Sequence, residues 1–140
     1  TYGKVGGYNP IDAVRYNYFT TMAGVMEKED STNWEFVVSP ELKAQYASGD
    51  YGAYADADGT MHVCFLTNND ITGGNSGSPV IDAKGRLLGL AFDGNWDSLS
   101  SDLLFDSQLA RCIGVDIRFV LYMMDKWGHA DRLLEEINAK

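Results

Sequence analysis

The stretch Ile71–Phe92, ITGGNSGSPVIDAKGRLLGLAF, constrains the fold of this chain more than any other part of the sequence. A glycine-rich segment that ends in Pro79 leads into two apolar runs, and Ala83-Lys84-Gly85 joins those runs. Apolar runs separated by a short turn with glycine are typical of a β-hairpin. The stretch therefore predicts a tight loop followed by two antiparallel strands.

Further strands and a helix are predicted before this loop. Val14–Glu29 is rich in aromatic and β-branched residues with partial alternation, which indicates one or two strands, and Thr60–Thr67 indicates another. Ser39 followed by Pro40 is a helix-start signal, and Gly49 is a stop signal. We therefore expect a short helix between Ser39 and Gly49.

The last third of the chain changes to a helical pattern. Asp116 can cap a helix that ends at Gly128, and Ala130–Asn138 indicates a second helix. The apolar residues of the first helix follow the i, i+3, i+4, i+7 spacing, namely Ile117, Val120, Leu121 and Met124. The predicted fold class is mainly β, with a mostly antiparallel core and C-terminal helices from about residue 117.

Length and charge exclude several classes of protein. The chain has 140 residues, enough for one domain with a sizeable core. Its formal net charge is −9 and it has no basic stripe, so we expect no nucleic-acid partner. No apolar run approaches the roughly 18 residues of a membrane-spanning helix.

Neither cysteines nor acidic residues predict a metal site. Cys64 and Cys112 have no metal-ligand spacing, and we expect them to be unbridged apolar residues. The DADG run at Asp56–Gly59 is similar to a calcium loop, but Tyr54 stands at its first ligand position and Phe65 at its closing position. We therefore expect no metal and no cofactor.

The loop before Pro79 contains a candidate nucleophile. Gly74 lies two residues before Ser76 and Gly77 lies one residue after it, which leaves room for the backbone amides of Gly74 and Ser76 to point at a developing oxyanion. The elbow of α/β-hydrolases does not fit, because Ser78 stands at its final glycine position and a hairpin follows instead of a helix. The loop G-[DN]-S-G-[GS]-P of chymotrypsin-like double barrels does fit, with Ser76 as the nucleophile.

The two histidines do not complete a catalytic triad. His62 lies on the strand that leads into the loop, whereas the base of a double barrel comes from the other barrel. We expect His62 to be a strand-face histidine and His129 a helix-end histidine near a C-terminal dipole. Because the base is missing and the chain begins TYGKVGG, we expect it to be processed or to be the C-terminal part of a larger enzyme.

Five segments carry a resemblance to a known family. They are NDITGGNSGSPV (Asn69–Val80), GLAFDGNW (Gly89–Trp96), VDIRFVLYMMDKWG (Val115–Gly128), YNYFTTMAGVMEKED (Tyr16–Asp30) and FVVSPELKAQY (Phe36–Tyr46). Together they resemble the C-terminal region of the bacterial dipeptidyl-peptidase 7 and 11 family of serine exopeptidases. The serine loop alone also resembles the staphylococcal glutamyl endopeptidases.

The resemblance implies a chymotrypsin-like catalytic domain of two barrels with a large helical domain inserted between them. Residues 1–140 would form most of the second barrel, and the catalytic His and Asp would lie in an N-terminal part outside this chain. Members remove dipeptides from the free N-termini of peptides in the bacterial periplasm or at the cell surface. They act as homodimers and need no metal.

The resemblance also implies roles for individual residues. Ser76 would be the nucleophile, and the amides of Gly74 and Ser76 would be the oxyanion donors. Asp93 would pair with the α-ammonium group of the substrate, and Phe92 would belong to the same substrate-binding segment. Gly94 would leave an open pocket and select a hydrophobic residue before the scissile bond, where an arginine would select an acidic one.

Other interpretations of these residues stay open at this point. Asp93 and Gly94 could simply shape a turn. Asp70 stands where trypsin-like enzymes carry the acid that selects lysine or arginine, and we expect it to be structural here. The whole protein could be a glutamyl-type endopeptidase, or a non-catalytic barrel that uses the serine loop for binding.

Overall fold

The structure is a computed structural model that describes residues 1–101 and 103–138. These residues divide into two compact units. The first unit comprises Thr1–Thr20 and Val63–Ile117, and the second comprises Thr21–His62 and the residues from Arg118 onward. All the residues proposed for the serine site therefore lie in the first unit.

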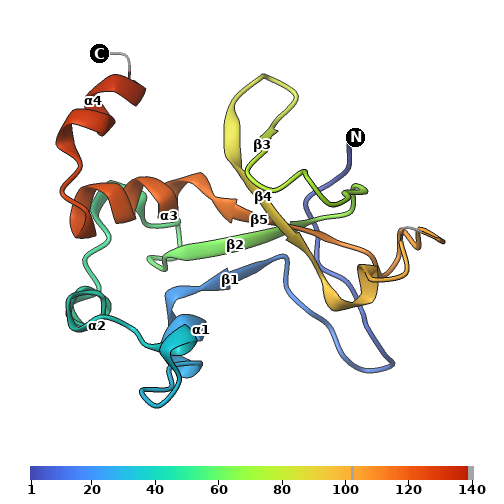
Figure 1. The fold of residues 1–140 in the computed structure, drawn as a ribbon, viewed down its shortest axis with the longest axis horizontal. Coiled ribbons are helices and arrows are strands. Elements are labelled where there is room, and N and C mark those ends of the chain that lie inside the picture. Colours follow the sequence, from blue (N-terminus) through green and yellow to red (C-terminus); the bar gives the residue numbers. More distant parts are fainter. Residues whose placement is uncertain (102, 139–140) are drawn as a thin grey trace. The chain divides into compact units, whose positions relative to one another are not determined.

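A five-stranded sheet in the order β1-β2-β5-β4-β3 is the main β element (Figure 1). Three neighbouring pairs are antiparallel, namely β2 with β5, β5 with β4, and β4 with β3. The predicted antiparallel core is thereby confirmed. The strands are β1 (Phe19–Thr21), β2 (His62–Thr67), β3 (Pro79–Ile81), β4 (Leu87–Gly94) and β5 (Cys112–Asp116).

The hairpin β3–β4 has its turn where the sequence predicts it. One carboxylate oxygen of Asp82 accepts the backbone N–H of Lys84 at 2.8 Å and that of Arg86 at 3.0 Å. Gly85 has a φ of 78°, which a residue with a Cβ adopts only under strain. The aspartate and the glycine together close the turn and set the register of β4.

Close packing on glycines marks the core of the first unit. The Phe65 side chain, 7% exposed, lies over β4 and β5, so that a Cβ at Gly89 or Gly114 would come within 2.7 or 2.6 Å of its ring. Neither Cys64 nor Cys112 forms a disulfide bond, as expected, and Cys112 is buried. Cys112 lies opposite Thr67 in the sheet, whereas Cys64 lies opposite Val115.

The second unit is helical and contains a cluster of aromatic side chains. Tyr122 is fully buried, and its ring centroid lies 5.7 Å from that of Tyr51 and 6.1 Å from that of Tyr54. The helices are α1 (Met22–Glu27), α2 (Pro40–Ser48), α3 (Ile117–Tyr122), of which Ile117 belongs to the first unit, and α4 (Asp131–Asn138). A π-helical turn, Met123–Trp127, follows α3.

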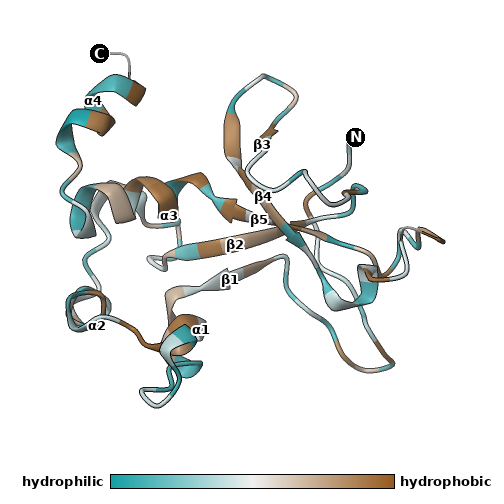
Figure 2. Cartoon of the chain, viewed as in Figure 1, coloured by the Kyte–Doolittle hydropathy of each residue, from teal (hydrophilic) through white to brown (hydrophobic). Residues whose placement is uncertain are grey.

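Most of the predicted helices are confirmed. Ser39 accepts the backbone N–H of Leu42 at 3.2 Å and caps α2, which ends at Gly49 with a φ of 65°. Helix α4, which the sequence also predicts, carries both hydrophobic and hydrophilic residues (Figure 2). Among the described residues, no helix combines the length and the apolar character needed to cross a membrane.

The prediction for Val14–Glu29 is only half right. Its first part contains β1, but Met22–Glu27 forms helix α1 instead of a second strand. Aromatic and β-branched residues carried the strand prediction, and they end at Thr21 apart from Val25. Alanine, methionine and glutamate, which favour helices, dominate the rest of the segment.

Candidate active site

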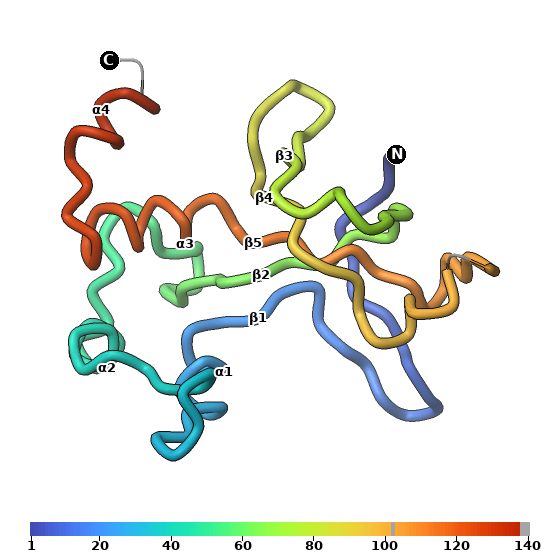
Figure 3. The backbone as a smooth tube through the Cα atoms, viewed as in Figure 1, coloured from blue at the N-terminus to red at the C-terminus, as the bar shows by residue number. Residues whose placement is uncertain are grey.

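Two successive turns shape the loop of residues 68–78 between β2 and β3, whose path Figure 3 traces. A backbone hydrogen bond of 3.2 Å closes the turn Thr72–Asn75, and one of 3.0 Å closes the turn Asn75–Ser78. The third residue of each turn is a glycine with a positive φ, 94° at Gly74 and 84° at Gly77. A Cβ is strained at both positions, so the loop needs these two glycines on either side of its serine.

The loop is fixed to strand β4 by its backbone. The Gly77 N–H donates to the Ala91 carbonyl at 2.7 Å, and the Ala91 N–H donates to the Ser78 carbonyl at 2.8 Å. Within the loop, the Asn75 side chain accepts the Thr72 N–H at 2.9 Å. These bonds hold Ser76, which lies between Asn75 and Gly77, beside β4 without using its side chain.

Ser76 itself is exposed and available. Within the described part of the chain, neither its hydroxyl nor the backbone amides of Gly74 and Ser76 make a hydrogen bond. A reactive serine with two adjacent free amides is the arrangement that nucleophilic attack and oxyanion stabilisation require. The roles assigned to Ser76 and Gly74 stay predictions that this geometry accommodates.

The end of β4 is irregular where it passes the loop. The register of β4 with β5 shifts between Ala91 and Asp93, so Phe92 lies in a β-bulge. The Phe92 side chain is 58% exposed. A bulge changes the direction of the side chains that follow it, and it is common next to active sites.

Asp93 presents a carboxylate with unused hydrogen-bonding capacity. The residue is exposed, and its Oδ1 accepts the N–H of Gly94 at 2.8 Å. Its Oδ2 accepts no hydrogen bond from any residue that the structure describes. The local bond orients the carboxylate and leaves one oxygen for a ligand cation.

The structure brings the predicted side chains together. Ser76, Phe92, Asp93 and Gly94 line one cavity of about 200 Å³, and Ser98 lines it as well. Gly74 is not part of this lining and would contribute only its backbone amide. The cavity therefore joins the candidate nucleophile to the carboxylate and to the glycine of the predicted specificity position.

A larger hollow of about 400 Å³ lies in the second unit but lacks such chemistry. Val25, Phe36 and Trp127 are among its apolar residues. Its serine, Ser39, already accepts the Leu42 N–H and the Trp127 Nε1–H, each at 3.2 Å. We therefore place the candidate site at the smaller cavity.

A buried polar framework that sequence reasoning missed supports the chain just after β4. Asn95 accepts the Arg111 N–H at 2.7 Å, donates its own N–H to the Arg111 carbonyl at 2.9 Å, and donates from its side chain to the Leu109 carbonyl at 2.9 Å. The Arg111 guanidinium donates to the Gly7 carbonyl at 3.0 Å and lies 5.2 Å above the Tyr8 ring. Burial lowers the pKa of the Arg111 guanidinium. No sequence motif pairs residues 95 and 111, so only the fold reveals this support.

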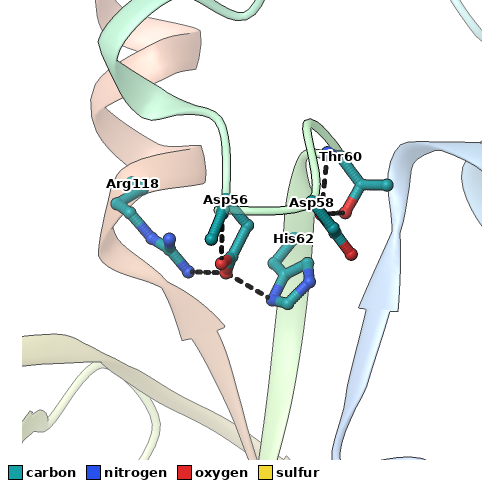
Figure 4. Close-up of polar contacts among 6 residues, drawn as sticks. Asp56, Asp58, Thr60, His62 and Arg118 are labelled. Carbon is teal, nitrogen blue, oxygen red and sulfur yellow. Dashed lines mark hydrogen bonds and ion pairs between the residues drawn. The ribbon is translucent and has the colours of Figure 1, made fainter.

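The histidines are engaged in local structure. His62 is buried as the first residue of β2, and its Nδ1 lies 3.1 Å from Asp56 Oδ2, as Figure 4 shows. Arg118 Nη2 lies 2.9 Å from the same oxygen. The prediction of a strand-face histidine is confirmed, and His129 follows the π-helical turn as an exposed residue with a φ of 47°.

The acidic residues set aside in the sequence have local roles or lie outside the cavity. Asp56 binds Arg118 and His62, and Asp58 accepts the Thr60 N–H at 2.9 Å (Figure 4). The backbone N–H of Ala57 and the Arg118 guanidinium lower the pKa of the Asp56 carboxyl. Asp70 does not line the cavity that contains Ser76.

Sequence reasoning missed the cavity-lining residues that follow Gly94 in the chain. Ser98, Leu99 and Ser101 line the cavity together with the predicted residues. The short helical turn Trp96–Ser98 carries this segment back toward the cavity. Their only sequence signal is that they follow Gly94 within a few positions.

Comparison with known proteins gives consistent matches over the whole chain. The family model for peptidase S46 matches residues 1–139. A dipeptidyl-peptidase 7 of Phocaeicola vulgatus is 60% identical over 98% of this chain, and an Asp/Glu-specific dipeptidyl-peptidase of Porphyromonas gingivalis is 54% identical over 99% of it. In each case the match covers 19% of the relative, so this chain spans about a fifth of the length of these proteins.

A solved structure matches equally well. The crystal structure of Porphyromonas endodontalis DPP11 in complex with the dipeptide Arg-Glu superposes with a TM-score of 0.94 at 47% sequence identity. The match covers 97% of this chain and 20% of that one. The sheet and helices described above thus correspond to one segment of a larger protein of known structure.

Proposed function

The chain belongs to the peptidase S46 family, and on this basis we propose that it is the serine-bearing part of a serine dipeptidyl-peptidase. In this proposal, residues 1–140 form the second barrel of a chymotrypsin-like catalytic domain, with the helices from about residue 117 at its end. The first barrel, the helical insertion and the catalytic His and Asp lie in other parts of the protein. The relatives, which are about five times longer than the match, support the existence of such parts.

The single observation that carries the proposal is the exposed Ser76 between two glycine turns, with free amides beside it. A histidine from outside this chain takes the Ser76 proton, and the Ser76 oxygen attacks the carbonyl of the second residue of the peptide. The Gly74 and Ser76 amides stabilise the oxyanion. The histidine then protonates the leaving amine, and water hydrolyses the acyl-enzyme to release a dipeptide.

Asp93 gives the enzyme its requirement for a free N-terminus. Its carboxylate lines the same cavity as Ser76 and keeps one oxygen free for an α-ammonium group. A charge-assisted hydrogen bond of this kind favours substrates with an unblocked amine. The names of the relatives, dipeptidyl-peptidase 7 and Asp/Glu-specific dipeptidyl-peptidase, support release of dipeptides.

Gly94 is the basis for proposing a hydrophobic residue before the scissile bond. Without a side chain at this position, none of the described residues that line the cavity is a cation that could pair with an acidic substrate residue. The relatives do not support one preference over the other, because one of those that match is named Asp/Glu-specific. The proposed preference therefore rests on Gly94 alone.

Further parts of the proposal concern the whole protein. We propose a homodimer in the periplasm or at the cell surface of a bacterium, with peptides as its substrates. Large apolar side chains are exposed on each unit, with Trp34 84%, Trp96 84% and Leu103 95% exposed. Such side chains support contact between these surfaces and other parts of the protein. Residues 1–140 alone are expected to be inactive, because Ser76 lacks its base.

Two experiments on the full-length protein test the proposal. A fluorophosphonate probe should label it, and the label should disappear in Ser76→Ala but persist in Ser78→Ala. Peptides with free N-termini should be cleaved and their N-acetylated forms should not. Equal cleavage of both forms would indicate an endopeptidase of the glutamyl type, and a label that survives Ser76→Ala would indicate that the loop only binds.

A further inference from the structure

We infer that Ser98 is a second specificity-determining residue of the cavity and acts as a pair with Gly94. The Ser98 hydroxyl fills the space in which any side chain at position 94 would begin. The inference rests on the proposed function, because it assigns to this pair the side-chain preference of that same cavity.

The obstacle to a side chain at position 94 is a single atom. A Cβ built on Gly94 comes closer than 3.0 Å to Ser98 Oγ, a separation that real Cβ atoms essentially never show. The same Cβ lies 3.5 Å from Ser98 Cβ and 3.9 Å from the Arg111 carbonyl oxygen, and both are ordinary contacts. Gly94 does not have a positive φ, so its backbone conformation suits any residue. The Ser98 hydroxyl is therefore the atom that would have to move to make room for a side chain at position 94.

The Ser98 hydroxyl is held in this place. It donates to the Asn95 carbonyl at 2.7 Å, and the Ser98 N–H donates to the same carbonyl at 3.0 Å. The bonds between Asn95 and Arg111 fix that carbonyl in turn. The hydroxyl can move away from position 94 only if its hydrogen bond to Asn95 breaks. A side chain at position 94 would therefore clash with a hydroxyl that is held in place.

The two positions consequently have different roles in selecting a substrate. Position 94 carries the group that would meet the substrate side chain, and position 98 decides whether such a group fits. Both residues line the cavity that contains Ser76. An arginine at position 94 gives an acidic preference only after the Ser98 hydroxyl has been removed, and Gly94→Arg alone disturbs the cavity.

The first test is a double-mutant cycle in the full-length protein with Gly94→Ala, Ser98→Ala and both together. Gly94→Ala should lower the melting temperature by roughly 2–4 °C and kcat/KM about tenfold, because it overpacks the cavity wall. The double variant should regain most of both losses. Ser101→Ala is the matched control, since Ser101 lines the same cavity and no atom of it is among the nearest neighbours of the built Cβ. Gly94→Ala combined with Ser101→Ala should stay impaired.

The second test measures substrate preference. Peptides with a hydrophobic or an acidic second residue are compared in Gly94→Arg and in Gly94→Arg combined with Ser98→Ala. The ratio of kcat/KM for acidic over hydrophobic substrates should rise at least about tenfold more in the double variant, as expected for coupled neighbours. If positions 94 and 98 were not coupled, the ratio of kcat/KM for acidic over hydrophobic substrates would be the same in both variants.

Additive effects in the cycle, equal rescue by Ser101→Ala, or equal ratios in the two arginine variants would each overturn the inference. Failure of the proposed function gives a different result. In that case the unmodified protein cleaves no peptide, while the melting temperatures of Gly94→Ala and of the double variant still decide whether positions 94 and 98 form a pair.

Discussion

Two serines of this chain, Ser39 and Ser76, stand at comparable places and are used in opposite ways. Ser39 stands immediately before helix α2, and Ser76 stands shortly before strand β3. In the second unit, Ser39 Oγ accepts hydrogen bonds from Leu42 and Trp127. In the first unit, the Ser76 hydroxyl makes none among the described residues. The fold uses one hydroxyl for its own stability and leaves the other for a ligand.

The same contrast holds for two aspartates. Asp56 binds the side chains of Arg118 and His62, whereas Asp93 accepts a hydrogen bond from the Gly94 N–H and from no other residue that the structure describes. Residue type alone therefore does not separate a structural group from a candidate functional group. Within each of these two pairs the number of protein partners differs, and each prediction below changes one member of a pair.

The largest effect is expected for Ser76→Ala. The change removes the nucleophile and should lower kcat/KM of the full-length peptidase at least about 10³-fold. The melting temperature should change little, because the Ser76 hydroxyl makes no hydrogen bond to any residue that the structure describes. Hydrolysis and thermal unfolding are measured together. A large loss of stability in this variant would break the contrast with Ser39.

Asp93→Asn should reduce activity next most strongly. Loss of the charge-assisted bond to the substrate amine should lower kcat/KM for free peptides about 10- to 100-fold. N-acetylated peptides provide the comparison. They lack the charged amine and should not be cleaved by the unmodified protein, and Asp93→Asn should not lower any residual hydrolysis of them. Asp56→Asn is the matched control and should keep the preference for a free amine.

Asp56→Asn should instead lower stability, by about 1.5 kcal/mol for a partly exposed charged hydrogen-bond acceptor. The Asp56 carboxyl has a pKa below its ordinary value of 3.8, so it stabilises the fold above its unfolded-state pKa and loses that effect as the pH falls. The difference in melting temperature between the variant and the unmodified protein should thus be full at neutral pH and should shrink below about pH 4. A difference that grows on acidification would contradict the assigned ion pairs.

Ser39→Ala should have the smallest effect. Loss of the helix cap on α2 should reduce the unfolding free energy by about 1 kcal/mol and leave kcat/KM unchanged. Urea unfolding of the full-length protein measures the first quantity and peptide hydrolysis the second. A loss of activity as large as that of Ser76→Ala would remove the distinction between the two serines.

Local chemistry explains what the sequence could predict. Helix α2 follows from Ser39, Pro40 and Gly49, which lie within a dozen positions of one another. The serine loop and the β3–β4 hairpin follow from glycines whose positive φ the turns require. In these cases the residues that determine the element are neighbours in the chain.

The features that the sequence did not predict depend on contacts between residues distant in the chain or on shifts of strand register. The bulge at Phe92 arises from pairing between β4 and β5. The contact of Asp56 with Arg118 joins residues that no local pattern relates. Close approach of Ser98 to position 94 needs the backbone of the turn between them. Helix α1 was missed because propensity in Val14–Glu29 changes in mid-segment.

The Ser98 hydroxyl also has an evolutionary consequence. If the proposed pair holds, a side chain at position 94 is better tolerated after that hydroxyl is lost, so Ser98 favours one order of mutations over the other. The glycines that frame Ser76 lie in a different loop and are untouched by either step. Substrate preference can thus diverge between related proteins while the catalytic chemistry at Ser76 stays the same.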